Sequence, residues 1–147
     1  MVRFCMEKNQ KSLVKWALNK AKEYLESAKD NLEKNRLFPC AEDIFKAVET
    51  MLEALLYYYG VKKIEYPGLT KEFKGRLALQ FLVRDVLVLR KRIDRSVYDR
   101  YLALATELHF ASYKPTKIFE KSELEEHLKF AEDLFFKIKS SVKVDWK

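Results

Sequence analysis

Two histidines are the side chains of this sequence best suited to move a proton near neutral pH. His109 is expected near the end of a helix, where a cation offsets the helix dipole. A structural role is therefore its first interpretation, contact with a ligand is the second, and it is the one catalytic candidate. Glu107 lies about 200° from His109 around a helix, so the two do not form a ready metal pair. Around His127, three acidic residues indicate a solvated first helical turn: Glu123, Glu125 and Glu126. We predict neither a metal site nor a cofactor.

The strongest charge feature is the segment 84–100, which we call the Arg-rich corner. Its six cations are Arg84, Arg90, Lys91, Arg92, Arg95 and Arg100, against three aspartates. Guanidinium groups bind phosphate in a bidentate manner, and the neighbouring Tyr98 and Tyr101 could stack on unpaired bases. The alternative is a salt-bridged corner whose tyrosines belong to the core, and the pattern favours it slightly.

A run of three tyrosines, Tyr57, Tyr58 and Tyr59, is typical of a core that continues into a dimer interface, because each ring carries a polar tip. A small-molecule pocket between helices is the alternative. The two cysteines, Cys5 and Cys40, lack the spacing of a metal site, and we expect free thiols with Cys40 partly buried.

The net charge of +7 and the pI near 9.3 favour an anionic partner, chiefly RNA or an acidic protein surface. The alternative is the lysine- and glutamate-rich surface of a heat-adapted protein. The sequence has neither a signal peptide nor an apolar run of the ~20 residues that a membrane span needs. We therefore expect a cytoplasmic protein without membrane contact.

With three glycines and three prolines in 147 residues, the chain has few turn signals and long runs of helix-forming residues. The first predicted helix covers 12–35, with Ser12 as its N-cap. The second begins at Pro39 and stops at Gly60, and the third covers 77–89. A fourth runs from Asp94 or Ser96 to His109, and a fifth begins at a capping box of Ser122 and Glu125 and reaches 138. We predict an all-α, up-and-down bundle of four or five helices as one domain, 1–147, with 1–11 as a loose tail and 110–121 as a loop.

The segments 41–49 and 52–56, followed by Gly60, resemble the second helix of HEPN-domain proteins. Leu108, His109 and Phe110, followed by Tyr113, are similar to the end of the fourth helix in that family. The resemblance spans 11–142, and within the superfamily it is closest to the PaREP-type archaeal proteins of unknown function.

This resemblance implies a helical bundle that usually forms homodimers. HEPN proteins include metal-independent ribonucleases, toxins paired with small nucleotidyltransferase proteins, and inactive members that only bind. The active members share an arginine that is followed by a histidine with four to six residues between the two. For His109 those positions hold Leu102, Ala103 and Leu104, and Arg100 lies on the opposite helix face; for His127 they hold Glu120, Lys121 and Ser122.

Because neither histidine has the expected local arginine, the resemblance argues against the usual ribonuclease activity. The first hypothesis is a non-enzymatic homodimer that binds RNA or another anion through the Arg-rich corner. The second is a ribonuclease or toxin-like enzyme with a rewired site at His109. The third is a protein-binding module that uses its tyrosine and leucine face.

Overall fold

The computed structural model describes residues 7–66 and 75–142, and no strand occurs among them. Its helices are α1 Lys8–Glu33, α2 Leu37–Tyr58, α3 Arg76–Leu82, α4 Arg95–Leu104 and α5 Lys121–Ser141. Two π-helical turns, η2 Val83–Val88 and η3 Ala105–Phe110, extend α3 and α4, and a 3₁₀ turn, η4 Ala111–Tyr113, follows. The predicted all-α fold is confirmed, and 77–89 is helical.

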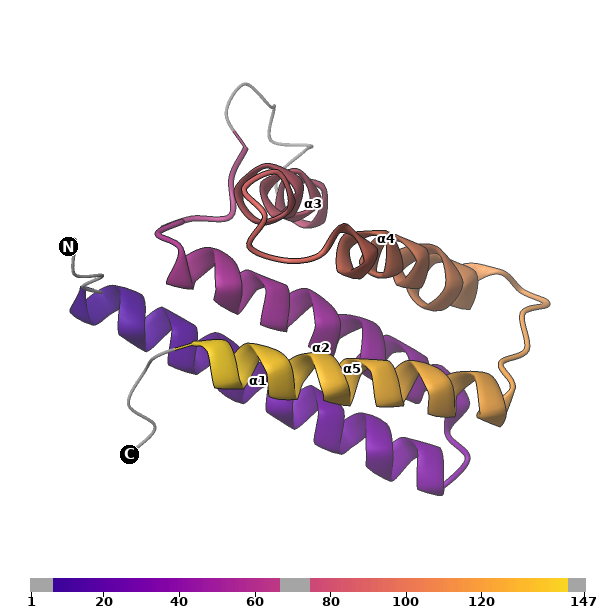
Figure 1. Cartoon of the computed structure of the whole chain (residues 1–147). Helices are drawn as coiled ribbons and strands as arrows, with labels where there is room; N and C mark the ends of the chain where they lie inside the picture. The colour runs from indigo at the N-terminus through magenta and orange to yellow at the C-terminus, as the bar shows by residue number, and fades with distance from the viewer. Residues whose placement is uncertain (1–6, 67–74, 143–147) are drawn as a thin grey trace.

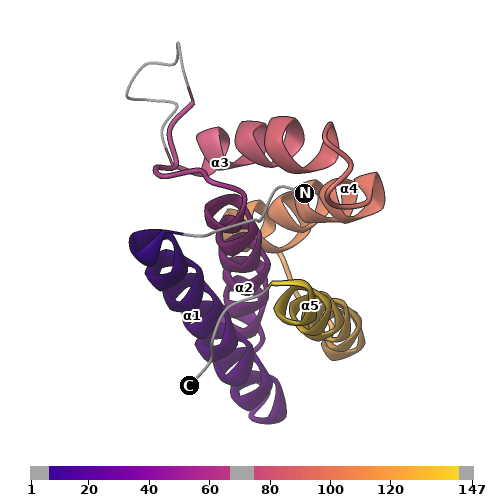
Figure 2. The ribbon, with the colours of Figure 1, turned by 60° about the vertical axis from the view of Figure 1, so that its left-hand side comes forward.

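Helix α2 lies at the centre of the molecule. It forms a hairpin with α1, α5 packs against both helices, and the α3–η2 and α4–η3 helices cover its remaining side (Figures 1 and 2). Buried apolar residues form a broad stripe along α2, from Cys40 and Phe45 to Leu55 and Leu56, and the last turn is apolar around its whole circumference. A helix with so wide an apolar surface has to be covered from several sides.

The first helix begins earlier than Ser12. Glu7 and Gln10 form a capping box, and the Gln10 side chain donates to the carbonyl oxygens of Tyr57 and Tyr58 at 3.0 and 2.8 Å. These contacts fix the first turn of α1 against the end of α2. Residues 8–11 are therefore helical, whereas 1–6 of the expected tail lie outside the described residues.

The starts of α2 and α5 also differ from the prediction. Helix α2 begins at Leu37, which places Pro39 inside the first turn, where a missing N–H breaks no intrahelical bond. Helix α5 begins at Lys121 after Glu120, whose carbonyl accepts from the Leu124 N–H at 3.2 Å. The prediction that Ser122 begins a capping box is therefore wrong, because Ser122 already lies within the helix.

Two boundary signals hold. Asp94 caps α4 by accepting from the Ser96 N–H at 3.2 Å. Gly60, directly after α2, has a φ of 99°, a conformation that residues with a Cβ rarely adopt. The predicted loop at 110–121 begins instead with helical turns, because η3 continues to Phe110 and η4 to Tyr113. None of the helices described is long and apolar enough to cross a membrane.

Candidate functional site

His109 lies on the π-helical turn η3, with 8% of its surface exposed. Its ring stacks on that of Phe45 from α2, with centroids 5.2 Å apart and planes 20° apart. Phe110 and Tyr113 meet the same imidazole edge-on at 5.2 and 5.4 Å. The imidazole is therefore held by rings of α2, η3 and η4.

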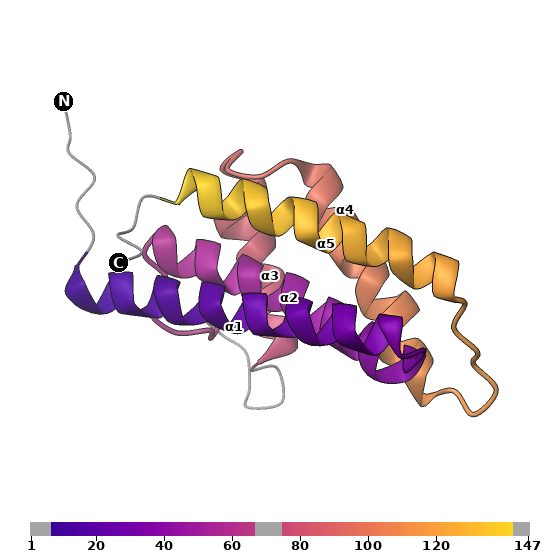
Figure 3. The same ribbon diagram turned by 90° about the horizontal axis from the view of Figure 1, so that it is seen from below.

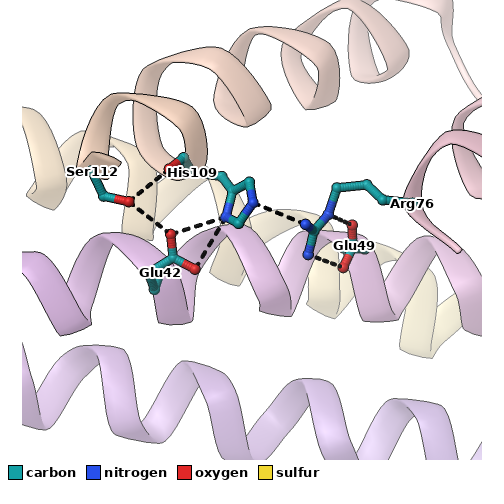
Figure 4. Close-up of polar contacts among 5 residues, drawn as sticks. All are labelled: Glu42, Glu49, Arg76, His109 and Ser112. Atoms are coloured by element: carbon teal, nitrogen blue, oxygen red, sulfur yellow. Dashed lines mark hydrogen bonds and ion pairs between the residues drawn. The ribbon is translucent and has the colours of Figure 1, made fainter. Parts of the chain in front are cut away.

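One ring nitrogen of His109 faces a carboxylate of α2. The Glu42 Oε1 and Oε2 atoms lie 3.0 and 3.2 Å from Nδ1 (Figure 4). The Ser112 hydroxyl lies 3.2 Å from Glu42 Oε1 and 2.6 Å from the His109 carbonyl oxygen. Glu42 thus accepts from both helical turns that carry the site.

The other ring nitrogen faces an arginine that is 33 positions away in the sequence. Arg76 Nη1 lies 2.9 Å from His109 Nε2. The same guanidinium bonds Glu49 in a bidentate manner, with Nε at 2.6 Å from Oε2 and Nη2 at 3.2 Å from Oε1, and its Cζ lies 5.0 Å from the Phe45 ring centroid. The hydrogen bond to Glu49 raises the pKa of the Arg76 guanidinium above its usual value.

These contacts assign the tautomer of His109. A guanidinium can only donate, so Nε2 accepts from Arg76 and Nδ1 carries the proton that is donated to Glu42. The result is a continuous chain, Glu42–His109–Arg76–Glu49, with a carboxylate at each end (Figure 4). We call it the Glu–His–Arg chain. For His109 to act as a base at Nε2, Arg76 would first have to move away.

His127 has a similar arrangement on α5. Arg100 Nη2 lies 3.0 Å from Nδ1, and carboxylate oxygens of Glu107 and Glu123 lie 3.4 and 4.0 Å from Nε2. Burial lowers the pKa of His127, and the charge of Arg100 lowers it further. The glutamates of this turn are solvated as expected, with Glu125 and Glu126 exposed, whereas His127 itself is only 7% exposed.

Both histidines thus have an arginine partner, although the spacing of arginines and histidines along the sequence predicts none. Arg76 and Arg100 come from other helices, and the contacts arise only when α3 packs on α2 and α4 on α5. Arg76 directly follows Gly75, at the start of a short helix, and no sequence signal identified it as a site residue. The acids Glu42 and Glu49 were likewise missed, because they occur among the ordinary polar positions of α2.

The structure divides the Arg-rich corner into two groups. Arg84 bonds its neighbour Asp85 at 2.7 Å and contacts Tyr66, while Arg92 lies 4.2 Å from the Tyr59 ring centroid. Arg100 faces His127, as described above. The remaining three cations, Arg90, Lys91 and Arg95, are exposed, with Arg95 in a solvent-exposed ion pair with Asp99 at 3.9 Å, and we call them the exposed corner.

Tyr98 is half-buried, whereas Tyr101 is fully buried and stacks on Phe45 at 6.2 Å. The prediction that Tyr101 stacks on unpaired bases is therefore wrong, because its ring belongs to the core. Its hydroxyl has no hydrogen-bond partner in the part of the chain that the structure describes. Burial raises the pKa of this hydroxyl.

The tyrosine run is covered within the chain. Tyr57 and Tyr58 are 7% and 9% exposed, and the Tyr57 hydroxyl donates to Glu53 at 2.5 Å, so both belong to the core as expected. The continuation of this core into a dimer interface stays a prediction. Tyr59 is half-buried beneath Arg92.

Cys40 is wholly buried, and burial together with the charge of Asp43 raises its pKa to about 11. Cys5 lies outside the described residues. Within the described ranges, no group of three His, Cys, Asp or Glu side chains could hold a metal ion.

The family model described as HEPN domain matches residues 14–140, which is most of the chain. Comparison with curated proteins and with solved structures gave no match. The particular likeness to PaREP-type proteins stays a prediction, since the match concerns the superfamily. The helical bundle and this match together assign the chain to the HEPN domain family.

Proposed function

We propose that this chain is a non-catalytic HEPN protein that binds RNA through the exposed corner formed by Arg90, Lys91 and Arg95. The observation that carries the proposal is a hollow of about 410 Å³ at the turn between η2 and α4. Its lining includes three cations, Lys91, Arg92 and Arg95, and one carboxylate, Asp94, which is engaged in capping α4. A phosphate group at this hollow would meet mainly positive charge.

The backbone gives this turn its shape. Lys91 has a φ of 57°, although it is not a glycine. It is the left-handed residue that ends the η2 helix, where the Arg92 N–H donates to the Leu87 carbonyl oxygen at 2.8 Å. The turn places Arg90 and Lys91 side by side in solvent, while Arg92 packs inward on Tyr59.

The Glu–His–Arg chain supports the non-catalytic part of the proposal. Both nitrogens of His109 are engaged, and a carboxylate neutralises the charge of Arg76. A catalytic histidine needs a nitrogen within reach of the substrate, and an arginine that holds a phosphate needs free donors. Glu49 occupies two of the donors of Arg76 and His109 a third.

The test is binding of a labelled single-stranded RNA by fluorescence anisotropy at two or more salt concentrations. Removing two phosphate contacts by Arg90→Ala/Lys91→Ala should weaken binding and lower the slope of log K against log salt by about 1.4, because each contact with a single strand contributes about 0.7. The matched control is Lys22→Ala/Lys29→Ala, which removes two exposed cations from α1. Equal losses in both double variants would refute a role for this corner.

A metal-independent ribonuclease is the second candidate, favoured by the 2.9 Å contact between Arg76 and His109. In this case substrate phosphate would replace His109 as the partner of Arg76, and the freed Nε2 would accept the proton of a ribose hydroxyl. Cleavage of RNA in the presence of EDTA, lost in His109→Ala and retained in His127→Ala, would establish this function. Intact RNA after long incubation would reject it.

The family also suggests partners for this proposal. We expect a cytoplasmic homodimer, with a small nucleotidyltransferase as an alternative partner. Sedimentation equilibrium of the full chain measures self-association directly, and a monomer at all concentrations would refute the dimer.

A further inference from the structure

Large apolar side chains are exposed at one end of the molecule. Phe38 at the start of α2 is 48% exposed, Phe110 is 53%, Tyr113 is 73% and Ile118 is 80%. We call these four residues the aromatic end. They lie around the first turn of α2 and the segment that leads from η3 to α5, which pass close to each other in Figures 1 and 3.

The contacts around His109 bring these rings together. Phe110 and Tyr113 meet the imidazole of His109, whose Nδ1 bonds Glu42. Glu42 is one helical turn after Phe38, so the two side chains share a face of α2. Phe38 in turn packs edge-on against buried Phe119, with centroids 5.2 Å apart. The rings of Phe38, Phe110 and Tyr113 are therefore anchored by the core, while about half or more of each side chain faces solvent.

The surroundings of the aromatic end are basic. Lys114 and Lys121 are exposed, and Lys117 lies with its Nζ 5.0 Å from the Phe119 ring centroid. Across the segment 110–121 these three lysines are accompanied by one carboxylate, Glu120, and exposed Arg36 directly precedes α2. Exposed aromatic faces among cations form the combination that single-stranded nucleic acids bind, because bases stack on the rings while phosphates meet the charges.

The same charges disfavour self-association at this face. A two-fold interface places the same patch of both copies in contact, and four cations around the rings would then approach their own copies. A polyanion with flat apolar faces fits both the charge and the rings. Duplex RNA does not, because its bases are stacked within the helix.

We propose that the aromatic end binds unpaired bases of single-stranded RNA by stacking, with Tyr113 as its main platform. This inference rests on the RNA binding proposed above and adds a second site, at the opposite end of the α4–η3 helix from the exposed corner. At 1.5 Å per residue, the 15 steps from Arg95 to Phe110 separate the two sites by about 22 Å. The protein would therefore select unpaired strands long enough to contact both sites.

The experiment compares a labelled oligouridine with an abasic strand of equal length, in which the phosphates remain and the bases are absent. Tyr113→Ala should weaken oligouridine binding by about 5- to 100-fold, in line with the loss of one stacked base. Binding of the abasic strand should be weaker from the start and unaffected by Tyr113→Ala.

Two further variants separate stacking from apolar contact. Tyr113→Trp should restore binding, because a larger ring stacks at least as well, whereas Tyr113→Leu should not. The matched control is Phe136→Ala on α5, since Phe136 is 72% exposed and Tyr113 is 73%. Wild-type affinity in Tyr113→Ala or Tyr113→Leu, or an equal loss in Phe136→Ala, would overturn the inference.

The outcomes also separate this inference from the proposed function. If Arg90→Ala/Lys91→Ala weakens oligouridine binding and Tyr113→Ala does not, RNA binding stands and the aromatic end is not its site. If the wild-type protein binds neither strand, both proposals fail. If Tyr113→Ala dissociates a dimer and leaves RNA affinity unchanged, the aromatic end is a self-interface and the inference is wrong.

Discussion

His109 and His127 are both buried, and each pairs with one half-buried arginine that is distant in the sequence. A buried polar group costs free energy unless its partners are present, so such pairs hold the packing of the helices that carry them. Glu42 is the partner most open to a test, because it joins α2 to η3 and η4 through His109 and Ser112.

Glu42→Ala should lower the free energy of unfolding by about 1–3 kcal/mol, because it leaves the Nδ1–H of His109 buried without an acceptor. Urea denaturation measures this directly. The control Glu26→Ala removes an exposed glutamate of α1 and should change stability by less than about 0.5 kcal/mol. Equal stability of the two variants would mean that the Glu–His–Arg chain contributes nothing to folding.

His127 makes stability depend on pH. Its pKa is lowered from the usual 6.5 in the folded protein by burial and by Arg100, against the opposing charges of Glu107, Glu123 and Glu126. Below pH 6.5 the unfolded chain therefore binds a proton that the folded chain does not, so the free energy of unfolding falls as the pH decreases towards the folded pKa.

His127→Gln should remove this part of the pH dependence. Urea denaturation at several values between pH 7.5 and 5 should give a smaller loss of stability in the variant than in the wild-type protein. The same loss in both proteins would show that His127 does not titrate as its surroundings indicate.

At the scale of the helices, the fold class and most elements follow from the sequence, whereas several boundaries do not. The broad apolar stripe of α2, which widens to the whole circumference in its last turn, predicts a central helix. Asp94 and Gly60 give correct limits, because these signals act within one turn. The start of α1 depends on Gln10 reaching α2, which is a tertiary contact. The π-helical turns that position His109 have no signal that we could identify in the sequence.

The two predicted caps of α4 and α5 allow a direct test of these boundaries. Asp94→Ala should destabilise the protein by about 0.5–2 kcal/mol, because the Ser96 N–H loses its acceptor. Ser122→Ala should have almost no effect, since Ser122 lies inside α5 and alanine favours helix. Thermal unfolding of both variants measures the difference, and a larger loss in Ser122→Ala would contradict the observed helix start.

For the molecule as a whole, the sequence predicts which charged residues belong to the candidate site but not which side chains contact one another. The Arg-rich corner is evident from residue types, but only packing reveals that Arg84, Arg92 and Arg100 are engaged and that Tyr101 is buried. Arg76 and His109 meet because η3 and the η2 extension of α3 both pack on α2, and spacing along the chain carries no information on that contact. The HEPN match defines the fold family and leaves the activity to the site.

RNA binding without cleavage is the central claim, and one titration tests it most directly. Labelled single-stranded RNA is titrated with the full chain at rising salt, and the same samples are then resolved on a denaturing gel. We expect saturable binding that weakens with salt, a slope of log K against log salt reduced by about 1.4 in Arg90→Ala/Lys91→Ala, and intact RNA throughout. RNA fragments that disappear in His109→Ala, or no binding at low salt, would contradict it.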